Sequence, residues 1–241
     1  MKEIMVKGVG AGWAGWEISL QGKTAIRLSG ENFYFTGQPQ PGMWVPRSGS
    51  TTKLFIYKAS NPRKVFRLDY HALEGSGGRP SWHYNKTSGF ARIDGLQVAN
   101  HAVTPSAIKT GRILTIFRWG GRAMFIAGMA MSVYDVYYAE NKTREIIRQT
   151  GGWAGAIVAG RFGASSGAKI GASAAVALGQ MGPQIATPEE LVTVPLGIAI
   201  GGILGGLGAG AVGWLAGTEI TETVYDWTFK LLEKEEWVIH E

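Results

Sequence analysis

The side chains with the clearest chemical potential are three histidines, His71, His83 and His101, which lie close together in a chain that contains only four. Alternation along residues 65–71 puts Asp69 and His71 on one face of a predicted strand. If the following strand carries His83, the two imidazoles meet across a hairpin with Asp69 beside them. Such a pair can supply the acid and the base of a hydrolytic reaction.

Three basic residues near the histidines, Arg67, Arg79 and Lys86, suit a phosphate substrate and favour a metal-independent nuclease. A His/His/Asp metal site with His101 as the third ligand uses the same side chains. A structural or merely exposed histidine pair is the plainest alternative. Because the spacing matches no metal-binding motif, we expect no bound metal and no cofactor. If the protein is an enzyme, its candidate catalytic residues are Asp69, His71, His83 and His101.

Short strands are the elements expected to position the histidines. Residues 25–28, 32–36, 53–58 and 64–70 are rich in β-branched and aromatic side chains, and they are separated by glycine, proline, serine and asparagine. We therefore predict an antiparallel, β-rich, basic module over residues 1–103, whose strands have one buried face and one polar face.

A glycine pattern inside this module fits a dinucleotide-binding fingerprint. Gly10, Gly12 and Gly15 match G-x-G-x-x-G, which requires a helix directly after the glycines. Residues 16–20 are predicted to form a strand instead, so we reject this interpretation.

The charge of the chain divides near residue 151. Residues 1–150 hold 20 Lys and Arg against 9 Asp and Glu, whereas the remainder holds 4 against 9. A basic surface attracts polyanions, and the interleaved aromatic side chains suit either a lipid headgroup interface or stacked bases. Anionic membrane lipid is the favoured partner and nucleic acid the weaker one.

Two absences narrow the class of protein. The chain has no cysteine, which excludes a disulfide scaffold, a Cys-ligated zinc site and a thiol nucleophile. Lys2, Glu3 and Lys7 interrupt the start of the chain, so no signal peptide is expected. Export would then depend on another apparatus.

A helical linker is predicted over residues 104–150. Thr104 and Pro105 form a helix-start signal, and residues 123–134 contain no charge. Twelve uncharged residues are too few to cross a bilayer. We therefore expect this stretch to be a buried helix rather than an amphipathic interfacial one.

Glycine dominates residues 151–218, which are predicted to form a helical hairpin. Residues 151–217 hold 18 of the 36 glycines. Small residues recur every four positions, so each helix presents a smooth groove to a second backbone. Because glycine costs about 0.8 to 1 kcal/mol relative to alanine inside a helix, lipid or tight packing must compensate. The expected packing glycines are Gly163, Gly167 and Gly171 in the first arm and Gly197, Gly201, Gly205, Gly213 and Gly217 in the second.

The second arm is long enough to span a membrane. Residues 191–218 carry no charge and would form about 42 Å of helix, against a hydrocarbon core of about 30 Å. In the first arm, Arg161 and Lys169 each cost about 2.5 to 3.5 kcal/mol at mid-bilayer unless they reach the interface or face a lumen. A helix pair packed inside a soluble protein or oligomer is the alternative. An acidic amphipathic helix is predicted at residues 219–241.

Several stretches between residues 134 and 217 resemble the glycine-zipper tails of bacterial polymorphic toxins of the Rhs type. They are YDVY at 134–137, NKTRE at 141–145, GGWAGA at 151–156 and GIAIGGILGG at 197–206. Residues 66–85 are also similar to histidine-bearing segments near the ends of Rhs-type effectors. The resemblance implies helices that enter or cross a target membrane, loading onto a secretion apparatus or chaperone, and a cognate immunity protein that protects the producer. The large upstream repeat domain of that family is missing from this sequence, which leaves the delivery route open.

These features predict an α+β protein with a β-rich module, a helical linker and a glycine-rich hairpin. Its most direct interpretation is a secreted or injected antibacterial toxin that inserts into a target-cell membrane, self-associates and permeabilises it. The alternative is a secreted effector enzyme, nuclease-like and histidine-based, whose hairpin serves translocation. A non-toxic scaffold or membrane-anchored adaptor is the third class.

Overall fold

Long helices and one antiparallel sheet make up the described part of the chain, which confirms the predicted α+β fold. The computed structural model describes residues 2–28, 31–43, 52–73, 75–87, 101, 103–180 and 193–239. In chain order its elements are α1 (Lys2–Gln21), β1 (Thr24–Leu28), β2 (Glu31–Thr36), β3 (Thr52–Lys58), β4 (Asn61–Ala72), β5 (Pro80–Lys86), α2 (Pro105–Tyr138), α3 (Lys142–Gln180) and α4 (Thr193–Ile239).

Residues 2–21 form the helix α1, so the strand predicted for residues 16–20 is wrong. Aromatic and branched residues favour a strand locally, but tertiary packing overrides that preference. Trp16 and Leu20 are buried against other elements of the bundle. The glycines of the rejected nucleotide-binding pattern lie in this helix and face its neighbours.

The five strands form a meander in the order β1-β2-β3-β4-β5, with every neighbouring pair antiparallel. One face of the sheet packs against the helices. The buried side chains of that face are Ile26, Phe33, Phe35, Leu54, Ile56, Phe66, Leu68 and Tyr84. The opposite face carries Arg67 and Asp69, as alternation predicts, but both are buried. The polar face of β4 is therefore enclosed, beside a second apolar cluster that contains Phe55, Tyr57 and Val65.

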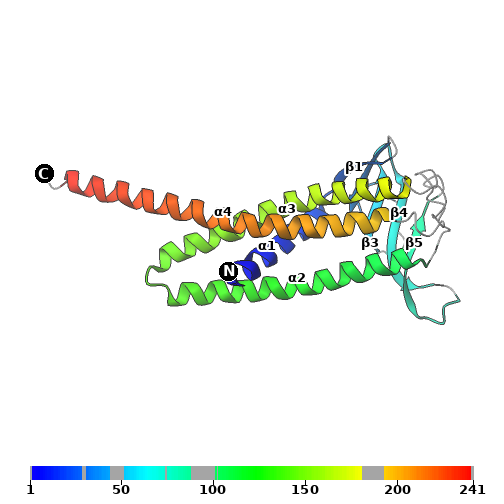
Figure 1. The fold of residues 1–241 in the computed structure, drawn as a ribbon, viewed down its shortest axis with the longest axis horizontal. Helices are drawn as coiled ribbons and strands as arrows, with labels where there is room; N and C mark the ends of the chain where they lie inside the picture. Colours follow the sequence, from blue (N-terminus) through cyan, green and yellow to red (C-terminus); the bar gives the residue numbers. More distant parts are fainter. Residues whose placement is uncertain are drawn as a thin grey trace.

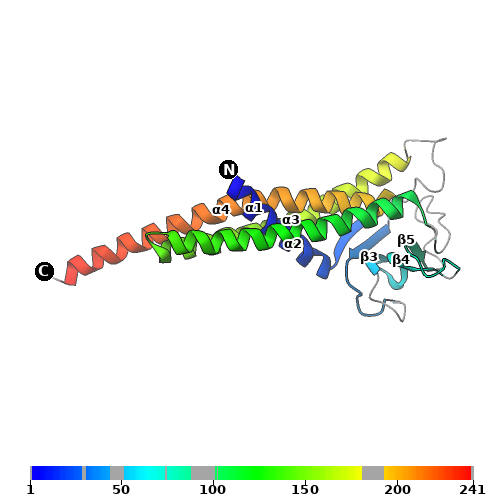
Figure 2. The same ribbon diagram turned by 90° about the horizontal axis from the view of Figure 1, so that it is seen from below.

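The helices form an elongated bundle with the sheet at one end (Figure 1, Figure 2). α3 and α4 run antiparallel, α2 extends beside them, and α1 packs against all three. Two tryptophans fix α2 by lying over glycines that leave room for their rings. Trp82 of β5 contacts Gly111, and Trp13 of α1 contacts Gly121.

α2 begins where its sequence signal predicts. Thr104 is the N-cap, and its Oγ1 accepts a hydrogen bond from the Ala107 amide at 3.1 Å. The buried helix predicted for residues 123–134 is wrong, because Ile126 is 61% and Val133 is 65% exposed. This stretch of α2 fully buries only Gly128 and Ser132, whereas Phe125 packs against Trp13 and Trp153 and Ile126, Met129 and Val133 are exposed.

The glycine arms are parts of longer helices. α3 runs without a break from Lys142 across residue 151, so the charged stretch at its start and the first arm are one helix. α4 continues from the second arm through residues 219–239 and projects beyond the other helices (Figure 1). The predicted turn between the arms falls at residues 181–192, outside the described residues.

Candidate functional site

The two glycine arms face each other in a single antiparallel register. Each small residue of α3 lies opposite one of α4, and steps of four residues preserve this register along both helices. The opposed pairs are Gly151 with Gly217, Gly155 with Gly213, Gly163 with Gly205, Gly167 with Gly201 and Gly171 with Gly197, and Ala159 and Ala209 stand at the step between. Every packing glycine predicted from the sequence lies in this contact, which we call the glycine ladder.

The glycine ladder leaves no room for side chains. A Cβ atom placed on Gly201 would overlap the carbonyl oxygen of Gly167 and lie 2.9 Å from its carbonyl carbon. A Cβ atom on Gly208 of the same helix would meet nothing within 4 Å. The ladder glycines are therefore required by the approach of the two backbones, whereas Gly208 is not.

Sequence reasoning misses two sets of glycines in this region. Gly151 and Gly155 continue the four-residue period of the first arm and could have been found by the same test. Gly12 of α1 gave no such signal. A Cβ atom on Gly160 of α3 would lie 2.8 Å from the Gly12 Cα, and one on Gly210 of α4 would overlap the same residue. Three backbones thus meet at glycines, and the rejected nucleotide-binding pattern serves helix packing.

The outer faces of α2, α3 and α4 expose many large apolar side chains, together with basic residues such as Arg112 of α2 and Arg161 and Lys169 of α3. The large exposed side chains are Ile116, Trp119, Ile126, Met129 and Val133 on α2, Val158, Phe162 and Ile170 on α3, and Ile200, Leu204, Val212, Leu215 and Ile220 on α4. Clusters of large exposed apolar side chains mark protein or membrane contact surfaces in many proteins. Among the described helices, α4 is long and apolar enough to cross a bilayer, between Val194 and Leu231, although a core helix of a soluble protein meets the same criterion.

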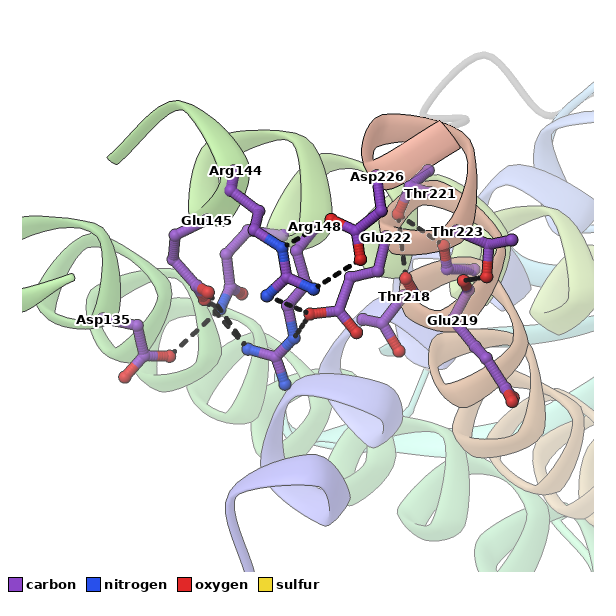
Figure 3. A network of polar contacts seen from close by, with 12 residues as sticks. Asp135, Arg144, Glu145, Arg148, Thr218, Glu219, Thr221, Glu222, Thr223 and Asp226 are labelled. Carbon is purple, nitrogen blue, oxygen red and sulfur yellow. Dashed lines mark hydrogen bonds and ion pairs between the residues drawn. The ribbon is translucent and has the colours of Figure 1, made fainter. Parts of the chain in front are cut away.

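Ion pairs join α3 to α4 beyond the end of the glycine ladder that lies away from the sheet (Figure 3). Arg144 of α3 contacts Glu222 at 3.3 Å and Asp226 at 3.1 Å on α4, and Arg148 contacts Glu222 at 3.4 Å. These side chains are partly exposed, so each pair adds little stability. Together they favour one register of α3 against α4.

One cation near these ion pairs is buried. Lys7 of α1 is 1% exposed, and its Nζ contacts Asp135 of α2 and lies 2.6 Å from Glu3 Oε1. Gln149 of α3 donates a hydrogen bond to Asp135 at 3.1 Å. Burial raises the pKa of Asp135, but hydrogen bonding and the positive charge of Lys7 outweigh this effect and leave the pKa below its usual value. The Asp135 carboxylate thereby connects three helices.

Asp69, His71 and His83 meet on the face of the sheet that points away from the helices. In the register of β4 with β5, Asp69 lies opposite His83. The Nε2 atoms of His71 and His83 are 3.2 Å apart, and the two ring planes are perpendicular. One carboxylate oxygen of Asp69 and one nitrogen of each ring lie within 4.8 Å of one another. Asp69 and His83 are fully buried, whereas His71 is partly exposed.

Hydrogen bonds to the main chain fix the hydrogen positions of both rings. His83 Nδ1 is 2.9 Å from the Ser81 carbonyl oxygen, and His71 Nδ1 is 2.9 Å from that of Ala72. Because a carbonyl oxygen only accepts, each Nδ1 carries the hydrogen and donates it. Neither neutral ring then carries a hydrogen on Nε2, although these two nitrogens are 3.2 Å apart. This arrangement needs a proton or a metal cation between the two nitrogens.

His101 lies next to this pair but outside the group that could share one ion. Its ring centroid is 6.1 Å from that of His83, its side chain is exposed, and its φ of 64° is in the left-handed region that few side chains adopt. Burial lowers the pKa of His83, with the rings of His71 and His101 acting in the same direction, and the Ser81 carbonyl and Asp69 opposing them. His83 therefore favours its neutral form.

Two side chains hold Asp69 in place. Asn85 Nδ2 donates a hydrogen bond to Asp69 Oδ2, and Arg67 Nη2 lies 3.4 Å from the same oxygen. Burial lowers the pKa of Arg67, and the Asp69 charge partly offsets this effect. Of the three basic residues suggested for a phosphate, Arg67 is thus enclosed beside Asp69, whereas Arg79 is exposed and Lys86 is half-buried.

Two arrangements in the described part of the chain therefore have the geometry of functional sites. One is the glycine ladder with its apolar outer faces, and the other is the cluster of Asp69, His71 and His83, which we call the histidine cluster. Comparison with protein-family models, curated proteins and solved structures gives no match for this chain.

Proposed function

We propose that this protein is a secreted or injected antibacterial toxin that inserts α3 and α4 into a target-cell membrane and permeabilises it. The observation that carries the proposal is the glycine ladder between two helices whose outer faces are apolar. In lipid, apolar side chains give helices no reason to pair, so association depends on small residues that let backbones approach closely. The α3 and α4 pair has this distribution of small and large residues.

The length of the glycine ladder supports this proposal. The paired segment runs from Gly151 to Gly171 on α3 and from Gly217 to Gly197 on α4. At about 1.5 Å per residue, this contact is about 30 Å long, which equals the thickness of the hydrocarbon core. The ion pairs of Figure 3 begin directly beyond it, so a hairpin inserted over the length of the ladder would hold them at the depth of the lipid headgroups.

Arg161 requires water or a polar partner within this span. It lies near the middle of the paired segment of α3 and is exposed, and an arginine at mid-bilayer costs about 2.5 to 3.5 kcal/mol on insertion scales. Several copies of the hairpin around a water-filled lumen would give Arg161 and Lys169 access to water. A pore-forming oligomer is therefore part of the proposal.

Exposed cations favour anionic lipid as the first surface to be bound. They are Arg27 and Arg63 on the sheet, Arg79 in the connection before β5, and Lys109, Arg112 and Arg122 on α2. Each basic residue near an anionic leaflet contributes about 1 kcal/mol of attraction. On the resemblance to Rhs-type tails, we also propose a secretion apparatus or chaperone that delivers the protein and an immunity protein that protects the producer.

Dye release from phosphatidylglycerol-containing liposomes tests the proposal with a matched pair of variants. Leucine at position 205 would overlap α3, whereas leucine at position 208 of the same helix meets open space. We expect wild-type and Gly208→Leu proteins to release dye, and Gly205→Leu to release it at a rate lower by roughly tenfold or more because its hairpin cannot close. Equal release by the two variants, or none by the wild type, would contradict the proposal.

The histidine cluster favours a second candidate function, a nuclease-like effector enzyme whose helical hairpin serves translocation. His71 is partly exposed and could reach a substrate, and His83 lies behind it at hydrogen-bond distance. If this function holds, His71→Ala should slow cleavage of plasmid DNA or RNA by about 10² to 10⁴-fold, the usual contribution of acid–base catalysis, with dye release unchanged. Absence of cleavage by the wild-type protein would remove this candidate.

A further inference from the structure

The two histidines of the cluster bring their Nε2 nitrogens close together with no ring hydrogen between them. Both Nδ1 atoms donate to main-chain carbonyls, so two neutral rings place their Nε2 lone pairs 3.2 Å apart. Lone pairs at this separation repel each other unless a positive centre lies between them. Neither membrane insertion nor packing of the sheet accounts for such a pair in the interior of a strand hairpin.

The separation of the two nitrogens matches that of ligands on one metal ion. Nitrogen ligands lie about 2.0 to 2.1 Å from Zn²⁺, and a tetrahedral angle then puts them about 3.3 to 3.4 Å apart. We propose that His71, His83 and Asp69 bind one divalent transition metal ion, with Zn²⁺ preferred. The carboxylate of Asp69 lies within 4.8 Å of both rings and supplies the third ligand.

The residues around the cluster already have the arrangement that metal ligands need. A histidine that binds a metal usually donates its other N–H to a carbonyl or carboxylate, which fixes the ring and its tautomer. His83 does so to Ser81, and His71 does so to Ala72. Asp69 is oriented in the same way by the amide of Asn85. Each of the three ligands therefore has an outer partner that holds it in place.

The donor set selects the class of metal. Ca²⁺ and Mg²⁺ prefer oxygen ligands, often six or more, whereas two imidazole nitrogens and one carboxylate suit Zn²⁺ and its transition-metal neighbours. Asp69 and His83 are fully buried and His71 is partly exposed, so water can reach the cluster on the side of His71. A fourth position on that side would be open to water or to a substrate.

A shared proton is the competing explanation, and metal titration separates the two. The full-length protein, stripped of metal with EDTA, is titrated with CoCl₂ while the visible absorption bands of four-coordinate Co²⁺ are recorded, and then with ZnCl₂ in competition with a chelating dye. We expect one equivalent of Zn²⁺ to bind and to displace Co²⁺. A wild-type protein that gives no Co²⁺ bands and binds no Zn²⁺ would overturn the proposal in favour of the proton.

Point variants test whether the residues of the histidine cluster bind the Zn²⁺. His71→Ala and Asp69→Asn should weaken Zn²⁺ binding by at least the 10 to 100-fold that loss of an outer partner alone produces. His240→Ala, the remaining histidine of the chain, serves as the matched control and should bind as the wild type does. Because His71 is partly exposed, its variant is expected to fold, which circular dichroism checks. Unchanged affinity in His71→Ala would overturn the site even if the protein binds Zn²⁺ elsewhere.

Discussion

Replacing Gly201 by leucine should lower the free energy of unfolding by about 4 kcal/mol or more, among the largest losses seen for one substitution. The new side chain would meet main-chain atoms on two sides. Its Cβ alone would overlap the Gly167 carbonyl oxygen and lie 3.1 Å from the Gly171 Cα. A neighbouring side chain could rotate away, but a backbone can move only by separating α3 from α4. Urea denaturation followed by circular dichroism measures the loss.

Alanine at Gly208 and at Gly201 should change the free energy of unfolding in opposite directions. Alanine is better than glycine in a helix by about 0.8 to 1 kcal/mol, so Gly208→Ala should stabilise the protein because its methyl group meets open space. At Gly201 the same methyl group overlaps α3, and overpacking of about 1 to 3 kcal/mol should reverse the sign. If both alanine variants were stabilising, the close approach of α3 and α4 would be wrong.

The parts of the fold that were predictable from the sequence rest on a regular spacing of residues. Small residues every four positions predict the ladder face of α3 and α4, because that period matches the helix. Alternation likewise predicts that Asp69 and His71 share a strand face, and the hairpin brings His83 beside them. In both cases the period of the helix or strand decides which face each side chain takes.

The errors arise where contacts between distant segments decide the structure. Trp16 and Leu20 favour a strand locally, yet α1 is a helix because its glycines fit between α3 and α4. Asp69 is buried because Asn85, on the neighbouring strand, donates a hydrogen bond to its carboxylate, which also pairs with Arg67. Neither outcome follows from the spacing of residues within one segment, since the partner lies elsewhere in the chain.

The hydrogen-bond geometry of the histidine cluster was likewise beyond prediction. The sequence indicates that His71 and His83 approach each other, but not that both Nδ1 atoms donate to carbonyl oxygens. That detail depends on the side-chain rotamers and on the positions of the Ser81 and Ala72 carbonyls. It is also the detail on which the proposed metal site rests.

Replacing Asp135 should lower the stability of the protein more than replacing its partner Lys7. Asp135→Asn leaves an ammonium group that is 1% exposed, with Glu3 as its remaining carboxylate. Loss of one partner of a buried pair costs about 3 to 5 kcal/mol, and we expect a value near the lower limit because Glu3 remains. Lys7→Met leaves a carboxylate that is 23% exposed and bonded to Gln149, so its cost should be smaller.

The double variant and the dependence on pH complete this test. With both charges removed, Lys7→Met/Asp135→Asn should recover part of the stability that Asp135→Asn loses, because no buried charge is left unpaired.

Since the folded pKa of Asp135 lies below its usual 3.8, its contribution is complete above that value and is lost as the pH falls through the folded pKa. Wild-type protein should therefore lose more stability than Asp135→Asn as the pH falls below about 4. Denaturation curves at several pH values measure the difference. Equal losses of stability in the two proteins would contradict the prediction and would mean that Glu3, not Asp135, is the carboxylate that stabilises the Lys7 charge.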